Sequence, residues 1–310
     1  MPQTTNTILM IRPVHFRMNE QTAVNNYFQE DLDLKNAEIN RKAQEEFDAF
    51  VEKLRAVGVT IIVEDDIESL NAPDSIFPNN WVSFHENGDV ALYPMFAENR
   101  RVERREDLFL RLEDAGFKIE NIIDYTEAEN EGVFLEGTGS LLLDRINKKA
   151  YCALSARADE DLFIEFCEDF DYAPIVFTAN QTVDNKRLPI YHTNVMMCLA
   201  EKFAVICLDS IDDKKERKLV VNNLKADGKA IITITEAQMH QFAGNMLQVQ
   251  GHLNQRYLVM SQAAHDALTE QQIKEIEKHC PILSSSLETI ETCGGGSARC
   301  MMAEIFLPKA

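Results

Sequence analysis

The sequence of 310 residues has no long apolar run and few basic residues for its size. Its 31 Lys and Arg residues are outnumbered by 51 Asp and Glu residues, so the formal net charge is −20 at pH 7. A surface this acidic repels phosphate groups, which makes nucleic acids and anionic membranes poor partners. Without a run of about 20 apolar residues, no membrane-spanning helix is expected either. The charge favours a cationic small molecule as the partner. An acidic surface can also serve only to keep the protein soluble.

Metal-binding and nucleotide-binding motifs are also missing. The seven cysteines include no C-x-x-C pair, and the chain has no histidine pair at ligand spacing, no EF-hand loop and no glycine-rich phosphate motif. We therefore expect no metal and no cofactor. The first residues lack the basic and apolar stretches of a secretory signal peptide, so we expect a cytoplasmic protein with free thiols. Most cysteines lie in apolar segments, where core packing is their usual role.

What the chain does contain is a repeat, which is sought before single motifs. Five small or polar turns run directly into apolar, strand-like segments. The turn segments read PNNWVSF, LEGTGSLLLD, YHTNVMMCL, AGNMLQVQ and GGGSARCMMAEIFLP, anchored at Asn80, Gly139, Asn194, Asn245 and Arg299. A second strand, an amphipathic helical stretch and a third strand follow the first four turns; 159–170 and 212–228 are examples of the helical stretches. The hydrophobic fraction of 45% is that of an ordinary globular protein.

The repeat predicts the fold. The last turn feeds the strand CMMAEIFL, and the missing partner of that strand is the first strand of the chain, NTILMIRP. Pairing of these two strands would close a ring and remove exposed sheet edges. We therefore predict one α/β domain over residues 1–310, a five-unit pseudo-symmetric α/β propeller closed by its N- and C-terminal strands. A doubly wound α/β sheet is the alternative. Residues 17–35 form an irregular insertion, which we interpret as a possible lid.

Three of the turns carry reactive side chains, and in a closed ring the turns meet at one end. Cys300 follows the glycine-rich GGGSAR segment, where residues such as Gly295 let the backbone approach a ligand closely. His192 lies in the third turn, and an imidazole near a thiol is the usual acid/base partner. Glu136 begins the second turn, E-G-T-G. Each residue has a plausible structural role by itself, but together they predict a Cys–His–Glu site.

With these motifs, the chain resembles the guanidino-group-modifying enzymes, which comprise arginine deiminases, dimethylarginine dimethylaminohydrolases and amidinotransferases. GGGSARCMM resembles the arginine deiminase nucleophile motif, LEGTGSLLLD a Glu-Gly-Gly-Asp strand, and YHTNVMM a His-x-Asp motif. DSIFPNNWVSF resembles a dimethylarginine hydrolase segment that ends in an acidic pair, and the segments around Arg100 and Arg101 and around Arg157 resemble two arginine segments of that group. The resemblance covers positions 73–310 and implies a five-unit α/β propeller.

The resemblance also implies roles for the residues at the matched positions. Cys300 would attack the central carbon of the substrate group. His192 would protonate the departing nitrogen and later activate water, and Glu136 would hold the planar nitrogens. The remaining substrate contacts implied by the matched segments are Arg157 and Arg101 (or its neighbour Arg100) for the substrate carboxylate, with Asp74, Asn79, Asn80, Asn194 and Gly295.

The departures from the family pattern bear on the substrate. Asn80 and Asn194 stand where arginine deiminases have two carboxylates that hold a guanidinium, and Gly139 replaces a third acid. A guanidinium loses compensation for its desolvation when those charges are absent, whereas a neutral ureido group finds both a donor and an acceptor in asparagine. We therefore expect a citrulline-like substrate. The resemblance to the bacterial citrulline-utilisation hydrolases points the same way. A purely structural role of the asparagines in capping turns is the alternative.

Several functions remain open at this point. The chain could be a hydrolase of citrulline, a hydrolase of arginine or dimethylarginine, or an amidinotransferase that uses an amine in place of water. A non-catalytic ring that binds an amino acid or a protein is a further alternative, against which the Cys300, His192 and Glu136 set argues. The expected partner is a small amino-acid substrate. The sequence leaves the oligomeric state open, and a homodimer is one possibility.

Overall fold

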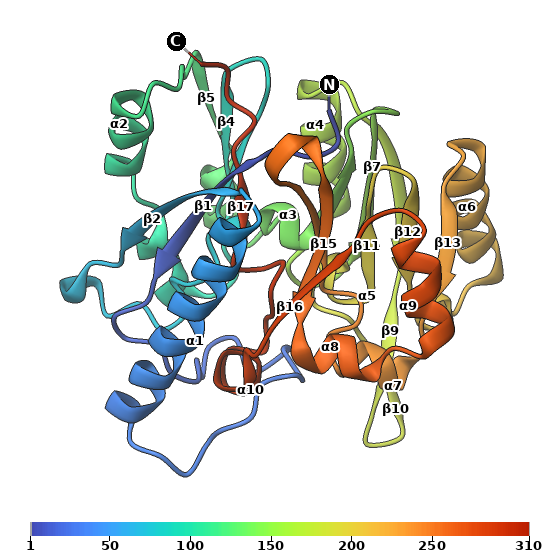
Figure 1. Ribbon diagram of the computed structural model, residues 1–310, viewed down its shortest axis with the longest axis horizontal. Coiled ribbons are helices and arrows are strands. Elements are labelled where there is room, and N and C mark those ends of the chain that lie inside the picture. The colour runs from blue at the N-terminus through green and yellow to red at the C-terminus, as the bar shows by residue number, and fades with distance from the viewer. Residues whose placement is uncertain (1, 310) are drawn as a thin grey trace.

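The structure is a computed structural model that describes residues 2–309. Its strands form five three-stranded sheets and one two-stranded hairpin (Figure 1). In each three-stranded sheet, the middle strand pairs antiparallel with one neighbour and parallel with the other. The α/β class and the five repeated strand units expected from the sequence are therefore present as five small mixed sheets.

Four of these sheets each consist of three consecutive strands, and the fifth combines the last strand of the described residues with the first two. In the order of pairing, the sheets are β17 (Ala303–Glu304), β1 (Thr7–Arg12) and β2 (Thr60–Asp65); β3 (Val82–Phe84), β4 (Asp89–Leu92) and β5 (Asn121–Asp124); β6 (Leu141–Asp144), β7 (Lys149–Leu154) and β8 (Ala173–Thr178); β11 (Met197–Leu199), β12 (Phe203–Ile206) and β13 (Ala230–Thr233); β14 (Leu247–Gln250), β15 (Arg256–Ser261) and β16 (Ile282–Ser285).

The two ends of the chain share one sheet. Strand β1 pairs antiparallel with β17, with Ile8 opposite Glu304 and Leu9 opposite Ala303. The pairing of the N- and C-terminal strands predicted from the sequence is thus confirmed. Each strand on its own would leave a row of unpaired backbone groups, and the pairing satisfies part of both rows.

Helices lie against the sheets and account for the amphipathic stretches of the sequence. The longer ones are α1 (Asn36–Ala56), α2 (Asp107–Asp114), α4 (Glu160–Asp169), α6 (Lys214–Ala226) and α9 (Glu270–Glu277). The side chain of Asp159 caps α4, that of Asp213 caps α6, and Thr269 with Gln272 forms a capping box on α9. Such caps satisfy backbone N–H groups that the first helical turn leaves free. Shorter helices are α7 (Glu236–Met239) and α8 (Gln262–Ala267).

Short helical turns precede strands β3, β6 and β11 and position the anchor residues. These are a 3₁₀ turn (Pro78–Asn80) before β3, α3 (Gly137–Ser140) before β6, and α5 (Thr193–Met196) before β11. The segment before β17 differs from the expectation. The third strand expected after the fourth turn is β16, which ends at Ser285, and helix α10 (Glu288–Gly294) follows it. The carboxylate of Glu46 on α1 accepts hydrogen bonds from the backbone N–H groups of Thr289 and Ile290, which caps α10 from a distant part of the chain.

A hairpin that the sequence analysis did not anticipate follows β8. It consists of β9 (Asn180–Val183) and β10 (Lys186–Pro189). Its two-residue loop, Asp184 and Asn185, has φ angles of 49° and 61°. Both residue types tolerate this left-handed region, which two-residue hairpin loops require.

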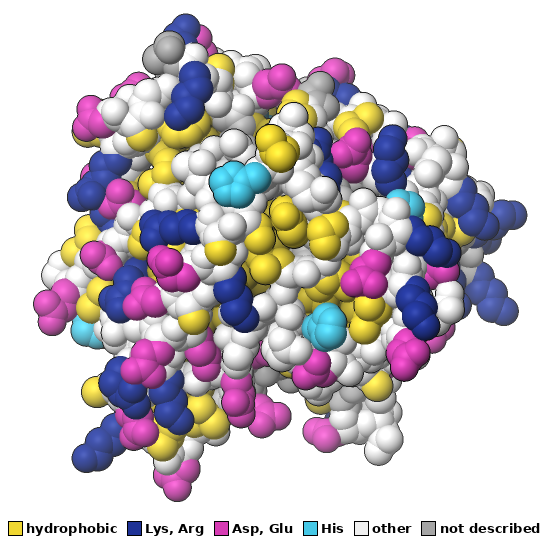
Figure 2. All heavy atoms as spheres, viewed as in Figure 1, with side chains coloured by type: hydrophobic (Ala, Val, Ile, Leu, Met, Phe, Trp, Pro, Cys, Tyr) yellow, Lys and Arg dark blue, Asp and Glu magenta, His cyan; other side chains and the backbone are white. Residues whose placement is uncertain are grey.

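The interior contains four clusters of buried apolar side chains that join neighbouring units. Acidic side chains are scattered over the face seen in Figure 2 among Lys and Arg residues, and they do not gather in one patch. Within residues 2–309, no helix is both long and apolar enough to cross a membrane. The high negative charge is accordingly a distributed surface property on this face.

Candidate active site

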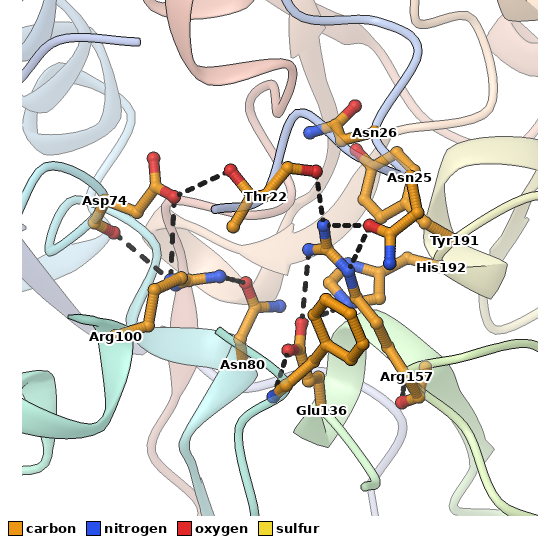
Figure 3. A network of polar contacts seen from close by, with 12 residues as sticks. Thr22, Asn25, Asn26, Asp74, Asn80, Arg100, Glu136, Arg157, Tyr191 and His192 are labelled. Atoms are coloured by element: carbon orange, nitrogen blue, oxygen red, sulfur yellow. Dashed lines mark hydrogen bonds and ion pairs between the residues drawn. The ribbon is translucent and has the colours of Figure 1, made fainter. Parts of the chain in front are cut away.

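Residues from distant turns meet around a small, narrow cavity. The residues predicted from the sequence that line it are Asp74, Asn80, Arg157, His192, Gly295 and Cys300. Glu136 and Asn194 lie directly behind this lining, since Glu136 bonds to His192 and Asn194 to Cys300. The structure therefore brings together residues of the first, second, third and fifth turns. Figure 3 shows Asn80, Glu136 and His192 of the first three.

The nucleophile candidate lies in the glycine-rich loop that follows α10. Gly295 adopts a φ of 60°, in the region that glycine favours, and ends the helix. A Cβ on Gly294 or Gly296 would lie 2.8 or 2.9 Å from the ring of Phe77. Glycine is therefore needed for the close approach of this loop to Phe77, which places Cys300 at the cavity with only 3% of its surface exposed.

Two side-chain amides contact the sulfur of Cys300. Its Sγ receives hydrogen bonds from Asn194 Nδ2 at 3.5 Å and from Asn245 Nδ2 at 3.2 Å. All seven cysteines are buried free thiols. Burial raises the pKa of the other six, which are Cys152, Cys167, Cys198, Cys207, Cys280 and Cys293.

His192 and Glu136 occupy matching places in two repeats, each immediately before a single-turn helix. Their side chains meet, with His192 Nε2 at 2.7 Å from Glu136 Oε2. Burial lowers the pKa of His192 to about 4, against the opposing effect of Glu136, so the ring is neutral at pH 7. Burial also opposes ionisation of Glu136, but Arg157 and the hydrogen bond from His192 hold its pKa below the usual range.

These two protonation states fix the tautomer of His192. The Glu136 carboxylate can only accept hydrogen bonds, so Nε2 of the neutral ring carries the proton and donates it. Nδ1 is then an unprotonated acceptor, and it lies on the side of Gly139, where a Cβ would approach it to 2.8 Å. His192 Nδ1 is therefore a base that faces the space beside Asn80, and Glu136 orients the imidazole ring.

Arg157 lies between Glu136 and residues 22–25 of the irregular segment. Its Nη1 lies 3.4 Å from Glu136 Oε2, its Nη2 donates to the backbone carbonyl of Thr22 at 3.0 Å, and its Nε donates to Asn25 Oδ1 at 2.9 Å (Figure 3). The guanidinium also lies 5.0 Å from the ring centroid of Tyr191. Arg157 is only 1% exposed, as expected for a cation that belongs to the site.

The side chains of the adjacent residues Arg100 and Arg101, in the first repeat, make contacts in different places. Arg100 lines the cavity and is buried, with a two-point contact to Glu103 at 2.9 and 2.8 Å. Arg101, which we expected in the site, lies outside the lining: its Nε bonds to the Met95 carbonyl at 3.1 Å and pairs with Glu129 at 3.3 Å. Neighbouring residues in a 3₁₀ turn point in different directions, so only one of the two can face the site.

The first turn supplies both paired and unpaired polar atoms. Asn80 Oδ1 accepts from Arg100 Nη1 at 3.0 Å, while Asn80 Nδ2 is buried without a partner. One oxygen of Asp74 accepts from Asn19 at 2.7 Å and the other is unpaired. Burial raises the pKa of Asp74. Asn79 is fully buried with both side-chain polar atoms unpaired, but it does not line the cavity.

Gly139, at the place of the family's second acid, is required by its neighbours. A Cβ there would collide with Asn80 Nδ2 and lie 2.8 Å from His192 Nδ1. The amide of Asn80 thus occupies space that a larger side chain at position 139 would take. The two departures from the family pattern are therefore physically linked.

The irregular segment 17–35 contains no helix or strand and lies across the cavity. Thr22 and Asn26 line the cavity, and Asn26 Nδ2 donates to the Gly294 carbonyl at 3.3 Å. Gln29 donates to the Cys293 carbonyl at 3.1 Å. The sequence predicted residues 17–35 as an irregular insertion. It did not predict these contacts, because all of them join residues far apart in the chain.

Asn245 is the functional candidate that the residue-by-residue reading missed. It anchors the fourth turn, and it is fully buried against Cys300. Its place in the repeat was the available signal.

Within residues 2–309, no cluster of three or more His, Cys, Asp and Glu residues could hold a metal ion.

Comparisons with known proteins identify the family and the fold. A family model described as "N,N dimethylarginine dimethylhydrolase, eukaryotic" matches residues 12–307. Curated sequences give no match. Among solved structures, ArgZ, an arginine dihydrolase from the ornithine-ammonia cycle in cyanobacteria, is similar with a TM-score of 0.73 and 16% identity over 98% of this chain. The match covers 41% of the ArgZ chain, so this chain spans about two fifths of that protein.

Two further structures show the same likeness. The N-terminal domain of ArgZ, as a cysteine-to-serine variant bound to its substrate, gives a TM-score of 0.69 at 16% identity and covers 97% of this chain and 99% of that domain. A dimethylarginine dimethylaminohydrolase, as a histidine-to-glycine variant with an S-methyl-L-thiocitrulline adduct, gives a TM-score of 0.62 at 14% identity and covers 96% and 99%. These likenesses establish the fold. Because the family model spans nearly the whole chain, the chain belongs to the N,N-dimethylarginine dimethylhydrolase family of hydrolases, which act on carbon–nitrogen bonds of guanidino groups.

Proposed function

We propose that the chain is a cysteine-dependent hydrolase of citrulline, in which Cys300 forms a covalent adduct with the ureido carbon. The observation that supports it most directly is the orientation of Asn80. Arg100 can only donate hydrogen bonds, and its Nη1 bonds to Asn80 Oδ1, so Asn80 Nδ2 is an unpaired donor on the side of Gly139 and His192. A donor there suits the carbonyl oxygen of a ureido group and repels the N–H groups of a guanidinium.

Asn194 supplies the complementary group. Its Nδ2 bonds to Cys300 Sγ, and its Oδ1 is buried without a partner. An unpaired buried acceptor costs about 1–3 kcal/mol, which a bound donor recovers. A ureido NH₂ group has such donors. The pair Asn80 and Asn194 therefore matches one carbonyl and one NH₂ group on either side of the attacked carbon.

The reaction follows from the protonation states. The Cys300 thiol loses its proton to His192 Nδ1, and Sγ attacks the ureido carbon. The bond to the terminal nitrogen breaks, and this nitrogen leaves as ammonia with the proton held by His192. Water then adds to the S-thiocarbamate adduct as His192 removes its proton, and Sγ departs as the thiol. The carbamate product releases carbon dioxide and leaves ornithine, so citrulline and water give ornithine, ammonia and carbon dioxide.

The charged residues suit the amino-acid part of the substrate. Arg157 is bonded to neutral oxygens of Thr22 and Asn25 and, at 3.4 Å, to Glu136. A substrate carboxylate can displace the neutral partners with a stronger, charge-assisted contact. Asp74 has one unpaired carboxylate oxygen, which suits the substrate ammonium. Segment 17–35, with Thr22 and Asn25, would then cover the bound substrate as a lid.

Arginine is the second candidate, because the similar structure ArgZ is an arginine dihydrolase and Glu136 can accept from a guanidinium. The same Cys300, His192 and Glu136 set would also serve transfer to an amine. The test is ammonia and ornithine release from citrulline, arginine and methylated arginines, with and without added amines. Citrulline should react fastest, and faster turnover of arginine at equal concentration contradicts the proposal.

A variant pair tests the covalent step. Cys300→Ala should lose activity by about 10³-fold or more, since the nucleophile is gone. Cys167→Ala, at a buried thiol of α4 far from the cavity lining, is the matched control and should retain activity. Circular dichroism and thermal melting establish that both variants fold. Full activity of Cys300→Ala would rule out the covalent mechanism.

A further inference from the structure

His192 brings no positive charge to the sulfur of Cys300. The imidazole donates through Nε2 to Glu136, and burial lowers its pKa to about 4, so it carries no positive charge at neutral pH. The hydrogen bonds that reach Sγ come instead from two neutral amides, Asn194 at 3.5 Å and Asn245 at 3.2 Å. A nucleophilic cysteine reacts as its thiolate, and hydrogen bonds to the charged form favour that form.

Asn245 can face Sγ in only one way. Its Oδ1 accepts a hydrogen bond from the backbone N–H of Arg299 at 2.9 Å, and its Nδ2 donates to the backbone carbonyl of Asn194 at 3.1 Å. A flipped amide would place donor against donor and acceptor against acceptor. The backbone therefore fixes Nδ2 toward the sulfur, where its second N–H points at Sγ. Asn245 thus acts as a donor at this site.

Asn245 also ties the reacting loop to the third turn. Through Arg299 it contacts the residue immediately before Cys300, and through the Asn194 carbonyl it contacts the residue whose amide is the second donor to Sγ. All of these residues are at least 96% buried. The Asn245 side chain therefore holds the sulfur, its loop and the Asn194 donor in a fixed geometry. Because these groups are already ordered, the reaction costs no further side-chain entropy.

We propose that Asn245 is a further catalytic residue, which stabilises the Cys300 thiolate by donating an N–H to Sγ and which fixes the sulfur beside Asn194. The proposal deepens the cysteine mechanism above and rests on Cys300 being the nucleophile, but it does not depend on the substrate. Preorganised donors of this kind are worth about 10²–10³-fold in rate each.

The test is the pH dependence of Cys300 alkylation by iodoacetamide in the absence of substrate. The thiolate sulfur displaces iodide from the reagent carbon and forms a thioether, and a Cys300→Ser background shows any labelling of the other thiols. Peptide mapping by mass spectrometry locates the label. Asn245→Asp is nearly isosteric but replaces the donor by an acceptor, so the alkylation midpoint should move upward by roughly one pH unit or more. Asn222→Asp, exposed on α6, adds the same charge and should leave the midpoint unchanged.

Two further measurements keep the test decisive if the aspartate variant does not fold. Asn245→Ser retains a small donor and Asn245→Ala removes it, so the serine variant should react faster at neutral pH. In the unaltered protein, Cys300 should alkylate at lower pH than an unstructured cysteine peptide. A midpoint equal to that of the peptide, or a folded Asn245→Asp variant with an unchanged midpoint, overturns the proposal. Failure of citrulline turnover with the midpoint shift present would contradict the proposed substrate alone.

Discussion

Arg100 orients the side-chain amide of Asn80: its Nη1 donates to Asn80 Oδ1 at 3.0 Å, and Asn80 Nδ2 is left buried and unpaired at the cavity. The arginine is itself held by the two oxygens of Glu103, at 2.9 and 2.8 Å. A buried ion pair is thus used to point a neutral donor at the site. The polarity of the pocket near Cys300 follows from this contact as much as from the identity of residue 80.

Replacing both neutral amides by carboxylates, in Asn80→Asp with Asn194→Asp, should move substrate preference toward arginine. A carboxylate compensates the desolvation of a guanidinium, an effect of several kcal/mol for an unpaired buried ion, and offers no donor to a ureido oxygen. The rates with both substrates should fall, because Asn194 also bonds to Sγ. The ratio of kcat/KM for citrulline over arginine should fall by about tenfold or more, which corresponds to about 1.4 kcal/mol. An unchanged ratio would show that these asparagines do not select the substrate.

The prediction that Arg157, and not Arg101, binds the substrate carboxylate can be tested with a matched pair of substitutions. Arg157→Gln should raise KM by about tenfold or more, because the charge-assisted contact with the substrate carboxylate is lost. Arg101→Gln should change KM little, since its guanidinium pairs with Glu129 outside the cavity. Steady-state kinetics of both variants, with melting temperatures as the folding control, gives the comparison. A larger effect of Arg101→Gln would place the wrong arginine in the site.

The choice between these arginines shows what the sequence alone could not decide. The motif placed an arginine pair near the site, but direction within a 3₁₀ turn depends on partners elsewhere. Arg100 pairs with Glu103, three residues later in the same turn, whereas Arg101 pairs with Glu129, in the segment between β5 and α3. The three-residue spacing to Glu103 was a local signal, and the contact with Glu129 was not.

The fold was predictable where the pattern was local and repeated. Turn segments, amphipathic stretches and the missing partner of the last strand led to five strand units and to the pairing of β1 with β17. The hairpin β9–β10 and helix α10 escaped, since the hairpin is an insertion in one unit only and α10 is capped by Glu46 far away in the chain. The pseudo-five-fold symmetry, the single domain and the lid role of segment 17–35 stay predictions.

The low pKa of His192 predicts how pH affects the protein. Because burial lowers the folded-state pKa from about 6.5 to about 4, the unfolded chain binds more protons between these values. The contribution of His192 to stability is therefore complete above pH 6.5 and is lost as pH falls toward 4. The melting temperature of the unaltered protein, relative to that of His192→Gln, should decline across this window. NMR titration of the His192 ring should show a midpoint near 4, and a midpoint near 6.5 would contradict the assignment of a neutral base.

The last prediction concerns Gly139, where the family pattern has an acid. Gly139→Asp would seem to restore a carboxylate to the site, but its Cβ would collide with Asn80 Nδ2 and lie 2.8 Å from His192 Nδ1. Strain of this kind in a packed interior costs about 1–3 kcal/mol, so the variant should be less stable and should lose activity with every substrate. Gly132→Ala is the control: its added Cβ meets no atom within 4 Å, but its φ of 72° strains any residue other than glycine, so it should lose some melting temperature and keep full activity. If the collision is the cause, Asn80→Ala in the Gly139→Asp background should recover much of the lost melting temperature but not citrulline turnover. Recovery of neither would mean that Gly139 is needed for a reason other than the space taken by Asn80.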